Sequence, residues 1–410
     1  MQQDVRRTIR WTVAALALAV VLVALSSLLA GCGSASATLT TQTTAAVAST
    51  TTESAVTTES TSVTTTAPPA STAPPSSTET TASTETTGST ATTAPSGAGT
   101  LFLAISDSKF GFIKADGTWA IQPQYVTAYP FSEGLAAVRA PLGAGYGYID
   151  GTGSWVVQPP YFQADLFSQG LAAVEKQPGG PWGFVDAKGT LVVPLQFNYV
   201  TSFSAGLAAV QKDGKWGYID KTGAWVIQPK YDGALPYSEG LAAVRPDPNG
   251  TWGYLDPAGK LVIQPQFSAA GSFAQDLAAV QKGGKWGFIA ATGAWVIQPQ
   301  FATAQAFSEG LAAVTAAAGG AHGYIDKTGK LVIQPQFATA GPFSEGLAPV
   351  ALRQGGDFGY VDTTGAMVIQ PQFFDPGLGR LLFSNGLALV GKGQGYAYID
   401  KSGNVVWQSQ

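Results

Sequence analysis

A unit of 34 to 38 residues recurs nine times between residue 101 and the C-terminus, and this period limits the fold more than any other feature. The clearest copy begins at Leu207 and reads LAAVQKDGKWGYIDKTGAWVIQPKYDGALPYSEG. A fixed period of this size indicates an array of one supersecondary unit that buries its apolar face against its neighbours. A marker glycine defines the register in eight copies, at Gly111, Gly147, Gly183, Gly217, Gly253, Gly287, Gly323 and Gly359, and Ala397 takes its place in the ninth.

Each unit has the pattern of a small antiparallel sheet. The fourth copy places apolar or alternating segments at 207–210, 216–219 and 224–227, with a turn between each pair. Asp213-Gly214 is typical of a tight hairpin, and Asp220 to Gly223 has the residues of a second turn. Pro229 ends the last segment because proline cannot donate to a strand ladder. We therefore expect a three-stranded antiparallel meander followed by a connector of about a dozen residues.

The array is thus expected to be all-β, and its closure is the open question. It begins with Leu101 to Leu103 as a first strand and ends with Val405 to Trp407 as a third strand, so every unit is complete. No strand is divided between the two ends to latch a ring. This favours an open β-solenoid or superhelix, with a closed β-propeller as the alternative.

The N-terminal segment has the pattern of a bacterial lipoprotein signal. Arg6, Arg7 and Arg10 precede an apolar run from Val13 to Leu25, and Leu29-Ala30-Gly31-Cys32 follows. This order predicts a signal peptide at 1–31 and places the protein in the extracytoplasmic cell envelope, anchored to a membrane by a lipid on Cys32. Cys32 is the only cysteine, so a lipid attachment point explains it better than a disulfide does. The alternative is an uncleaved membrane anchor.

Residues 32–100 form a second region with no aromatic residue. Thr, Ser, Ala and Pro dominate it, and the only charges are four glutamates. Such a segment buries too little apolar surface to offset the entropy lost on ordering. We expect a disordered stalk that carries the array of nine repeats at 101–410.

Composition excludes several classes for the array. It holds 19 Lys and Arg against 21 Asp and Glu, because three Arg, Asp4 and four Glu precede it. A near-neutral, charge-poor head lacks the clustered basic residues of a nucleic-acid binder. Cys32 lies outside it, which excludes disulfides and zinc sites of the cysteine type. Gly143-x-Gly145-x-Gly147 lies in a hairpin rather than at a helix start, so no phosphate loop and no cofactor site is expected.

The repeated motifs resemble the bacterial WG repeat family. An aromatic-Gly pair such as Trp216-Gly217, an apolar run, Gln-Pro-Gln, and then Phe-Ser-Glu-Gly-Leu-Ala-Ala-Val follow in that family's order over about three quarters of the chain. The resemblance implies a binding or scaffolding module and names no ligand. The chain departs from the pattern where Phe110, Tyr146, His322, Phe358 and Tyr396 replace the Trp, and where Pro194-Leu195 replaces Gln-Pro.

Repeated polar residues are candidate sites that structure also explains. The aspartates after the second strand are either turn caps, which we prefer, or calcium ligands, although no second oxygen ligand recurs with them. His322 occupies an aromatic position and has no nameable partner for general-base chemistry. The glutamates of the Ser-Glu-Gly turns are interpreted as solvated loop residues. These two sets are Asp150, Asp186, Asp220, Asp256, Asp326, Asp362 and Asp400, and Glu133, Glu239, Glu309 and Glu345.

The tryptophans separate two binding functions. Those on third strands are Trp119, Trp155, Trp225 and Trp295, and those on second strands are Trp182, Trp216, Trp252 and Trp286. We expect most of them in the core. If those on third strands line an exposed groove, they could stack on sugar rings.

The marker glycine lies in mid-strand, where glycine usually weakens a sheet. Its repetition predicts the close approach of a neighbouring aromatic ring or backbone segment. Ala397 is explained on this basis if no tenth unit packs on the last copy.

These observations predict a surface-tethered, non-enzymatic scaffold that binds another protein, or alternatively a cell-wall glycan, through its repeats. We expect no catalytic residues, no metal and no cofactor.

Overall fold

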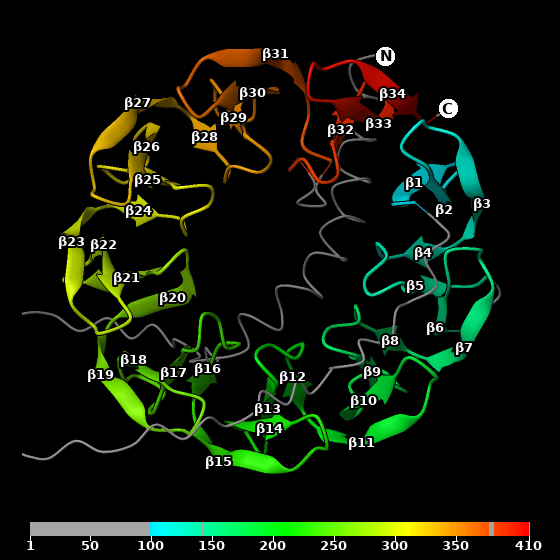
Figure 1. Ribbon diagram of the computed structural model, residues 1–410, viewed down its shortest axis with the longest axis horizontal. Helices are drawn as coiled ribbons and strands as arrows, with labels where there is room; N and C mark the ends of the chain where they lie inside the picture. Colours follow the sequence, from blue (N-terminus) through cyan, green and yellow to red (C-terminus); the bar gives the residue numbers. More distant parts are fainter. Residues whose placement is uncertain (1–98, 142, 144, 377–380, 410) are drawn as a thin grey trace, which may run out of the picture. The chain divides into compact units, whose positions relative to one another are not determined.

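The computed structural model describes residues 99–141, 143, 145–376 and 381–409, which fall in one compact unit of the chain. The expected signal peptide, Cys32 and the linker up to residue 98 lie outside the described residues. Nine small antiparallel sheets follow one another around a ring (Figure 1). The described residues contain no helix long and apolar enough to cross a membrane.

One sheet, or blade, shows how the repeat folds. In the fourth blade the order from the axis outward is β12 (Tyr199–Val200), β13 (Leu207–Lys212), β14 (Lys215–Asp220) and β15 (Trp225–Tyr231). β13 and β14 form the expected hairpin, with Lys212 opposite Lys215. Asp213 and Gly214 both have positive φ, as the Asp-Gly turn requires.

The other blades repeat this order. The inner strands are β4 (Thr127–Ala128), β8 (Gln163–Ala164), β16 (Gly233–Ala234), β20 (Ala269–Ala274), β24 (Thr303–Ala304) and β28 (Thr339–Ala340). The second strands are β1 (Phe102–Ser106), β5 (Ala136–Arg139), β9 (Leu171–Glu175), β17 (Ala242–Arg245), β21 (Leu277–Lys282), β25 (Leu311–Thr315), β29 (Leu347–Ala351) and β32 (Leu387–Lys392).

The third strands are β2 (Lys109–Ile113), β6 (Tyr146–Ile149), β10 (Trp182–Asp186), β18 (Trp252–Leu255), β22 (Lys285–Ala290), β26 (His322–Asp326), β30 (Phe358–Asp362) and β33 (Gly395–Asp400). The outer strands are β3 (Trp119–Tyr125), β7 (Trp155–Tyr161), β11 (Leu191–Phe197), β19 (Leu261–Phe267), β23 (Trp295–Phe301), β27 (Leu331–Phe337), β31 (Met367–Phe373) and β34 (Val405–Gln408).

The connector does more than the sequence suggested. In seven blades it adds a short inner strand to the expected meander, so these blades have four strands. The first and last blades have three. Only two residues usually pair in the inner strand, such as Ala234 with Val244, which is too short for a periodic pattern to reveal.

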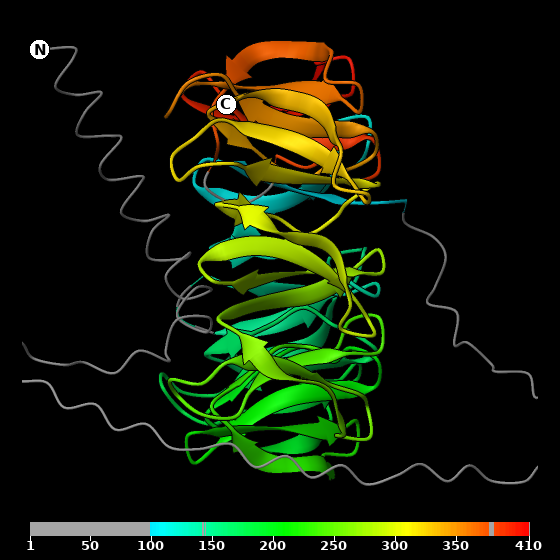
Figure 2. The same ribbon diagram turned by 90° about the vertical axis from the view of Figure 1, so that its left-hand side faces the viewer.

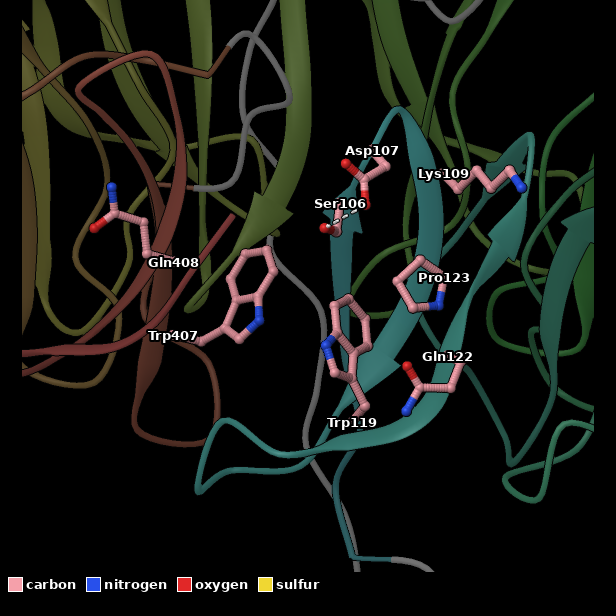
Figure 3. A pocket seen from close by; sticks show the side chains of 8 residues that line it. All are labelled: Ser106, Asp107, Lys109, Trp119, Gln122, Pro123, Trp407 and Gln408. Carbon is pink, nitrogen blue, oxygen red and sulfur yellow. Dashed lines mark hydrogen bonds between the residues drawn. The ribbon is translucent and has the colours of Figure 1, made fainter. Parts of the chain in front are cut away.

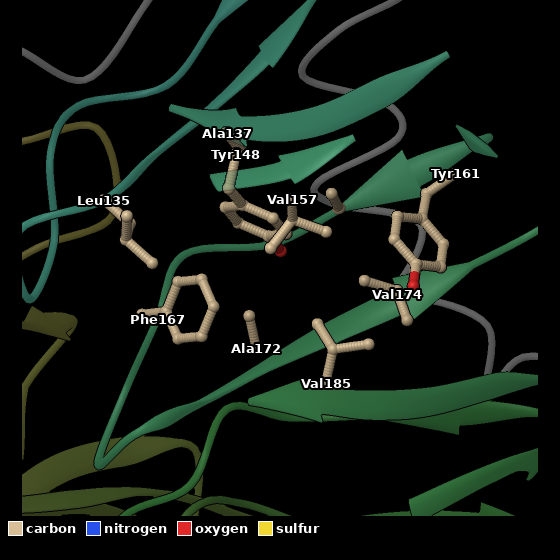
Figure 4. Close-up of a cluster of buried hydrophobic side chains, with 10 residues drawn as sticks. Leu135, Ala137, Tyr148, Val157, Tyr161, Phe167, Ala172, Val174 and Val185 are labelled. Atoms are coloured by element: carbon tan, nitrogen blue, oxygen red, sulfur yellow. The ribbon is translucent and has the colours of Figure 1, made fainter. Parts of the chain in front are cut away.

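The core lies between blades. Figure 4 shows the cluster between the second and third blades, where Tyr148 and Tyr161 of one meet Phe167 and Val185 of the next. The buried Tyr148 hydroxyl donates to the carbonyl of Asp165 in the following blade at 2.8 Å. Equivalent clusters occupy the other junctions, so each blade is stabilised mainly by its two neighbours.

The expected open solenoid is wrong, because the ring closes as a nine-bladed β-propeller. Phe102 and Ile113 of the first blade share a buried cluster with Leu389 and Trp407 of the last. The Tyr398 hydroxyl of the last blade donates to the Leu103 carbonyl at 2.8 Å. Closure therefore uses side chains and needs no shared strand. The sequence gives no measure of the rotation between blades, which decides whether the ends meet.

The marker glycines face a bulge in the outer strand of their own blade. Opposite Gly253, the outer strand inserts extra residues between its pairs with Trp252 and Tyr254. A Cβ on Gly253 would lie 2.5 Å from the Ile263 carbonyl oxygen and 2.7 Å from the Pro265 nitrogen. The close approach thus comes mainly from backbone within one blade, and at Gly147 the Trp155 ring adds to it at 2.8 Å.

The explanation expected for Ala397 is also wrong. Its methyl is fully buried in the cluster with Ile369 and Phe373 of the preceding blade, so a missing tenth unit has no bearing on it. Here the outer strand has no shift beside Ala397, which lies opposite Gln408, and the one remaining shift falls between Tyr398 and Ile399. Ser409 stands where most blades have proline, and its N–H donates to the Tyr396 carbonyl at 2.8 Å. Without the bulge, the methyl has room.

Candidate functional site

Strand direction gives the ring two different faces, which Figure 2 shows edge-on. In the fourth blade, Lys212 and Lys215 lie at one end of the strands, whereas Leu207 pairs with Asp220 at the other. We call the first side the hairpin face, since it carries the hairpins between second and third strands. The other side is the turn face, formed by the Ser-Glu-Gly turns and the aspartate turns.

The turn face is built from repeated, internally bonded turns. The Asp220 carboxylate accepts the Thr222 hydroxyl at 2.6 Å and the backbone N–H groups of Thr222 and Ala224 at 2.8 and 3.1 Å. The Thr222 hydroxyl bond, followed by the backbone bonds, holds the pKa of the Asp220 carboxyl below its usual value. The recurring aspartates therefore cap turns. The described residues contain no group of three acidic, histidine or cysteine side chains placed to hold a metal.

The turn glutamates lie in exposed loops, as interpreted from the sequence, but they also hydrogen-bond to the neighbouring blade. The exposed carboxylate of Glu239 accepts backbone N–H groups of Gln275 and Asp276 in the next blade at 2.7 and 2.8 Å. Ser238 beside it donates to the Phe273 carbonyl at 2.7 Å. Positive φ at Gln275 and Asp276 turns their N–H groups toward the carboxylate. These turns thus join blades, and only the repeated Ser-Glu spacing could have indicated it.

The hairpin face carries most of the variation between copies. Its hairpins range from the two-residue turn at Asp213-Gly214 to longer loops such as 246–251. Large apolar side chains also stand exposed here, near the connectors that cross from one blade to the next. They are Val126, Phe162, Tyr199, Leu352 and Phe374, with 37 to 50% of their surface exposed. Variable loops on a rigid scaffold are common positions for binding residues.

The fold also sorts charge between the faces, which the near-neutral total concealed. The hairpin face has an excess of four positive charges, and the turn face an excess of six negative ones. The hairpin face carries Lys109, Arg139, Lys176, Lys212, Lys215, Lys230, Arg245, Lys282, Lys285, Arg353 and Lys392, against Asp107, Glu175, Asp213, Asp232, Asp247, Asp357 and Asp375. The turn face carries Lys114, Lys188, Lys221, Lys260, Lys327, Lys330 and Lys401, against Asp116, Glu133, Asp150, Asp186, Asp220, Glu239, Asp256, Asp276, Glu309, Asp326, Glu345, Asp362 and Asp400.

Glu175 and Arg245 lie near the hairpin face and were not among the candidate residues identified from the sequence. Glu175 is 2% exposed, and burial raises the pKa of its carboxyl, partly offset by backbone bonds from Gly180 and Gly179. Arg245 places its guanidinium 5.4 Å from the centre of the Trp252 ring. His322 is half-buried, and its Nδ1 has no hydrogen-bond partner. In the strand pair it lies opposite Thr315.

The four tryptophans considered for stacking are half-buried at blade junctions. Trp155 meets Tyr125, Trp225 meets Phe197 and Trp295 meets Phe267, each ring nearly perpendicular to its partner at 5.7 to 6.2 Å. These three fill space between blades and do not form an open row.

Trp119 differs because it lines a hollow at the seam between the last and first blades (Figure 3). Its ring lies 5.7 Å from that of Trp407 at 87°. The hollow has a volume of about 540 Å³ and is lined by Ser106, Asp107, Lys109, Trp119, Gln122, Pro123, Trp407 and Gln408. Two indole rings and several hydrogen-bonding side chains thus share one concave site.

One similar solved structure supports the closed ring. The crystal structure of a eukaryotic initiation factor has a TM-score of 0.54 and 13% identity, and the match covers 76% of this chain and 98% of that one. AztD from Citrobacter koseri matches less well, with a TM-score of 0.38 and 14% identity over 66% of this chain and 90% of its own. At these identities the likeness concerns the fold alone.

No curated protein matches the sequence. The model of the WG containing repeat family matches residues 110–140, 146–177, 182–216, 216–245, 252–286, 286–315, 323–353 and 358–373. These segments include more than half of the chain and follow the blades one after another. The chain therefore belongs to the WG containing repeat family.

Proposed function

We propose that this propeller is a non-enzymatic scaffold that binds another protein through its hairpin face. The observation that carries the proposal is the contrast between the two faces. The turn face satisfies its own hydrogen-bonding groups, whereas the hairpin face exposes large apolar side chains, three of them aromatic, among variable loops; the other exposed apolar side chains, such as Val226 and Val262, lie on the outer strands. Exposed apolar groups within a polar surface are typical of protein interaction sites.

The charge distribution supports an acidic partner. Opposite charge on a partner would steer it to the hairpin face and away from the turn face. Strand addition at the outer edge is disfavoured, because prolines such as Pro229 and Pro265 interrupt it. A partner surface or loop that covers the hairpins therefore fits better than an added strand.

The proposed context is the bacterial cell envelope, with a lipid on Cys32 and the linker 32–100 as tether. The sequence signal described above is its basis. A long tether would let the head search for a partner while it stays attached to the membrane.

A differential cross-linking experiment with the full chain tests the scaffold. The variant Tyr199→Ser/Lys212→Glu changes the hairpin face, and Lys221→Glu is the matched change on the turn face. We expect an envelope protein that cross-links to the wild type to be lost with the first variant and retained with the second. Equal capture by all three proteins would refute binding through the hairpin face.

The alternative is a glycan-binding module, and the seam hollow is the one observation that favours it. Of the outer-strand tryptophans, Trp155, Trp225 and Trp295 are packed between blades, so a sugar-binding groove along the array has no support. The seam hollow is the separate place where rings and hydrogen-bonding groups meet.

A further inference from the structure

The fifth blade departs from the repeat at the start of its inner strand. The first residue of that strand has a side chain beyond the backbone in the other six inner strands, but it is Gly233 in β16. The six counterparts are Thr127, Gln163, Tyr199, Ala269, Thr303 and Thr339. A Cβ on Gly233 would lie 2.8 Å from Cη2 and 3.3 Å from Cζ2 of the Trp252 ring. The glycine therefore leaves the space that this indole occupies.

Trp252 in turn supports the side chain of Arg245. Arg245 is the last residue of β17 and pairs with Gly233, so both lie at the hairpin end of the blade. The guanidinium carbon of Arg245 lies 5.4 Å from the centre of the Trp252 ring, within the range of a cation–π contact. Gly233, Trp252 and Arg245 thus form one arrangement, which we call the arginine platform.

Among the described residues, no acceptor hydrogen-bonds the guanidinium of Arg245, and its Nε is buried without a partner. The Asp232 carboxylate lies beside Gly233 in the chain, but it accepts from the Lys215 Nζ of the preceding blade at 2.7 Å. An arginine has five N–H donors in a planar fork. Because the Trp252 ring holds this fork, Arg245 is already oriented for an acceptor from outside the fold.

The same position is bonded within its own blade elsewhere in the ring. In the sixth blade, the Ser268 hydroxyl donates to the side-chain oxygen of Gln281 at 2.9 Å. In the seventh, the hydroxyls of Thr303 and Thr315 share a hydrogen bond of 2.8 Å. The unused donors of Arg245 are therefore a property of the fifth blade and do not follow from the repeat.

The surroundings of the platform favour an acidic protein segment. The hairpin face has an excess of four positive charges, which attracts carboxylates. Tyr199 is 37% exposed and begins β12, the inner strand that precedes β16 around the ring (Figure 1). We propose that the arginine platform binds a carboxylate of an acidic protein segment, and that an apolar side chain of the same segment covers Tyr199.

A carboxylate matches the platform because its two oxygens can accept two parallel N–H groups of one guanidinium. A phosphate group matches less well. It carries up to two negative charges, and Lys215 is engaged by Asp232, which leaves Arg245 to meet them. The inference rests on the proposed function of the hairpin face and names the residue that selects the partner.

The repeat supplies substitutions for a test that the fold accepts. Glutamine stands at the position of Arg245 in β13 and β21, and threonine stands at the position of Gly233 in β4, β24 and β28. Calorimetric titration of the full chain would use the peptide acetyl-Glu-Glu-Phe-Glu-Glu-amide as probe. We expect Arg245→Gln to lower its affinity about tenfold or more. Arg245→Lys should lower it as well, because lysine keeps the charge but lacks the planar fork.

Matched variants separate the platform from charge alone. Arg139→Gln removes the same charge at the same position of β5, where the described residues show no cation–π contact. Gly233→Thr keeps every charge but displaces the Trp252 ring, and Ala269→Thr introduces the same side chain in the next blade. We expect Gly233→Thr to lower the affinity about tenfold, while Arg139→Gln and Ala269→Thr change it less than about twofold.

Several results would overturn the inference. They are failure of the peptide to bind the wild type at about 10 mM, equal loss with Arg139→Gln, and wild-type affinity in Arg245→Lys or Gly233→Thr. Equally tight binding of acetyl-Gln-Gln-Phe-Gln-Gln-amide, or tighter binding of inorganic phosphate, would also overturn it. The proposed function fails by a different result, which is equal cross-linking of the envelope protein by Tyr199→Ser/Lys212→Glu and the wild type.

Discussion

Replacing Gly253 with alanine tests the explanation for the marker glycine with a single methyl group. The new Cβ would lie 2.5 Å from the Ile263 carbonyl oxygen, 2.7 Å from the Pro265 nitrogen and 2.9 Å from the Gln264 carbonyl carbon. All three are backbone atoms, so no side chain can rotate away. The bulge must recede by roughly 0.9 Å to restore an ordinary contact.

This displacement should be costly because the bulge joins two paired segments of β19. Overpacking of a dense interior typically costs about 1–3 kcal/mol, and we expect the upper part of that range. For a ring of this size about 2 °C of melting temperature corresponds to each kcal/mol, so Gly253→Ala should melt roughly 4–6 °C lower. Thermal melts followed by near-ultraviolet circular dichroism would measure the shift.

Gly271→Ala is the control, because a Cβ there meets only the Ala279 oxygen at 3.4 Å. It should change stability by less than about 1 kcal/mol in either direction. Adding Pro265→Ser to Gly253→Ala should recover part of the loss, since Ser409 accompanies Ala397 in the last blade. If Gly253→Ala and Gly271→Ala have the same melting temperature, backbone crowding does not explain the repeated glycine.

Four further predictions address the joints, the turns and the anchor. Ala205→Glu should stabilise the ring by about 0.5–1.5 kcal/mol in denaturant titration, because the turn preceding Glu239 lacks the carboxylate that other blades use, and no gain would contradict this role. Tyr218→Phe should cost about 1 kcal/mol in the same assay through loss of its 2.8 Å bond to the Leu235 carbonyl, while an unchanged midpoint would show that the bond adds nothing. The pKa of Asp220 is lower in the folded chain than in the unfolded chain, so its contribution to stability is complete above the unfolded pKa of about 3.9 and is lost as pH falls through the folded pKa. Asp220→Asn should therefore reduce the dependence of melting temperature on pH in this acid range. Glu175, whose pKa is raised in the fold, acts in the opposite direction. Cys32→Ala should abolish fatty-acid labelling of the full chain, and equal labelling would disprove lipidation at this residue.

The sequence predicted most strand positions because each signal was local and repeated, but it ended the outer strand at Pro229, whereas β15 continues to Tyr231. Asp213-Gly214 and the alternating apolar residues of 216–219 lie in the hairpin and strand expected for them. The inner strand was missed because two paired residues leave no period. Closure was missed because it depends on a small rotation repeated at every junction, which no single residue encodes.

The site was less predictable for a related reason. The outer-strand tryptophans look alike in sequence, yet among them only Trp119 lines the hollow at the seam, where β34 pairs differently from the other outer strands. The hydrogen bonds of the turn glutamates were missed because their partners lie 36 or 37 residues away, in the next copy. The separation of charge between the two faces could not be predicted, because it depends on the direction of every strand and not on the total charge.

The side-chain seam has a consequence for how such rings can evolve. A propeller latched by a strand shared between its ends can gain a unit only if the latch is preserved. Here every blade is drawn from one continuous stretch, and the Tyr398 hydroxyl bond at the seam uses the same donor position as Tyr148, although its acceptor Leu103 lies in β1 and not in a connector. Duplication or loss of a whole unit would leave all joints of the same kind and alter only the angle shared among them. Ring size in this architecture is therefore open to change by simple gene duplication.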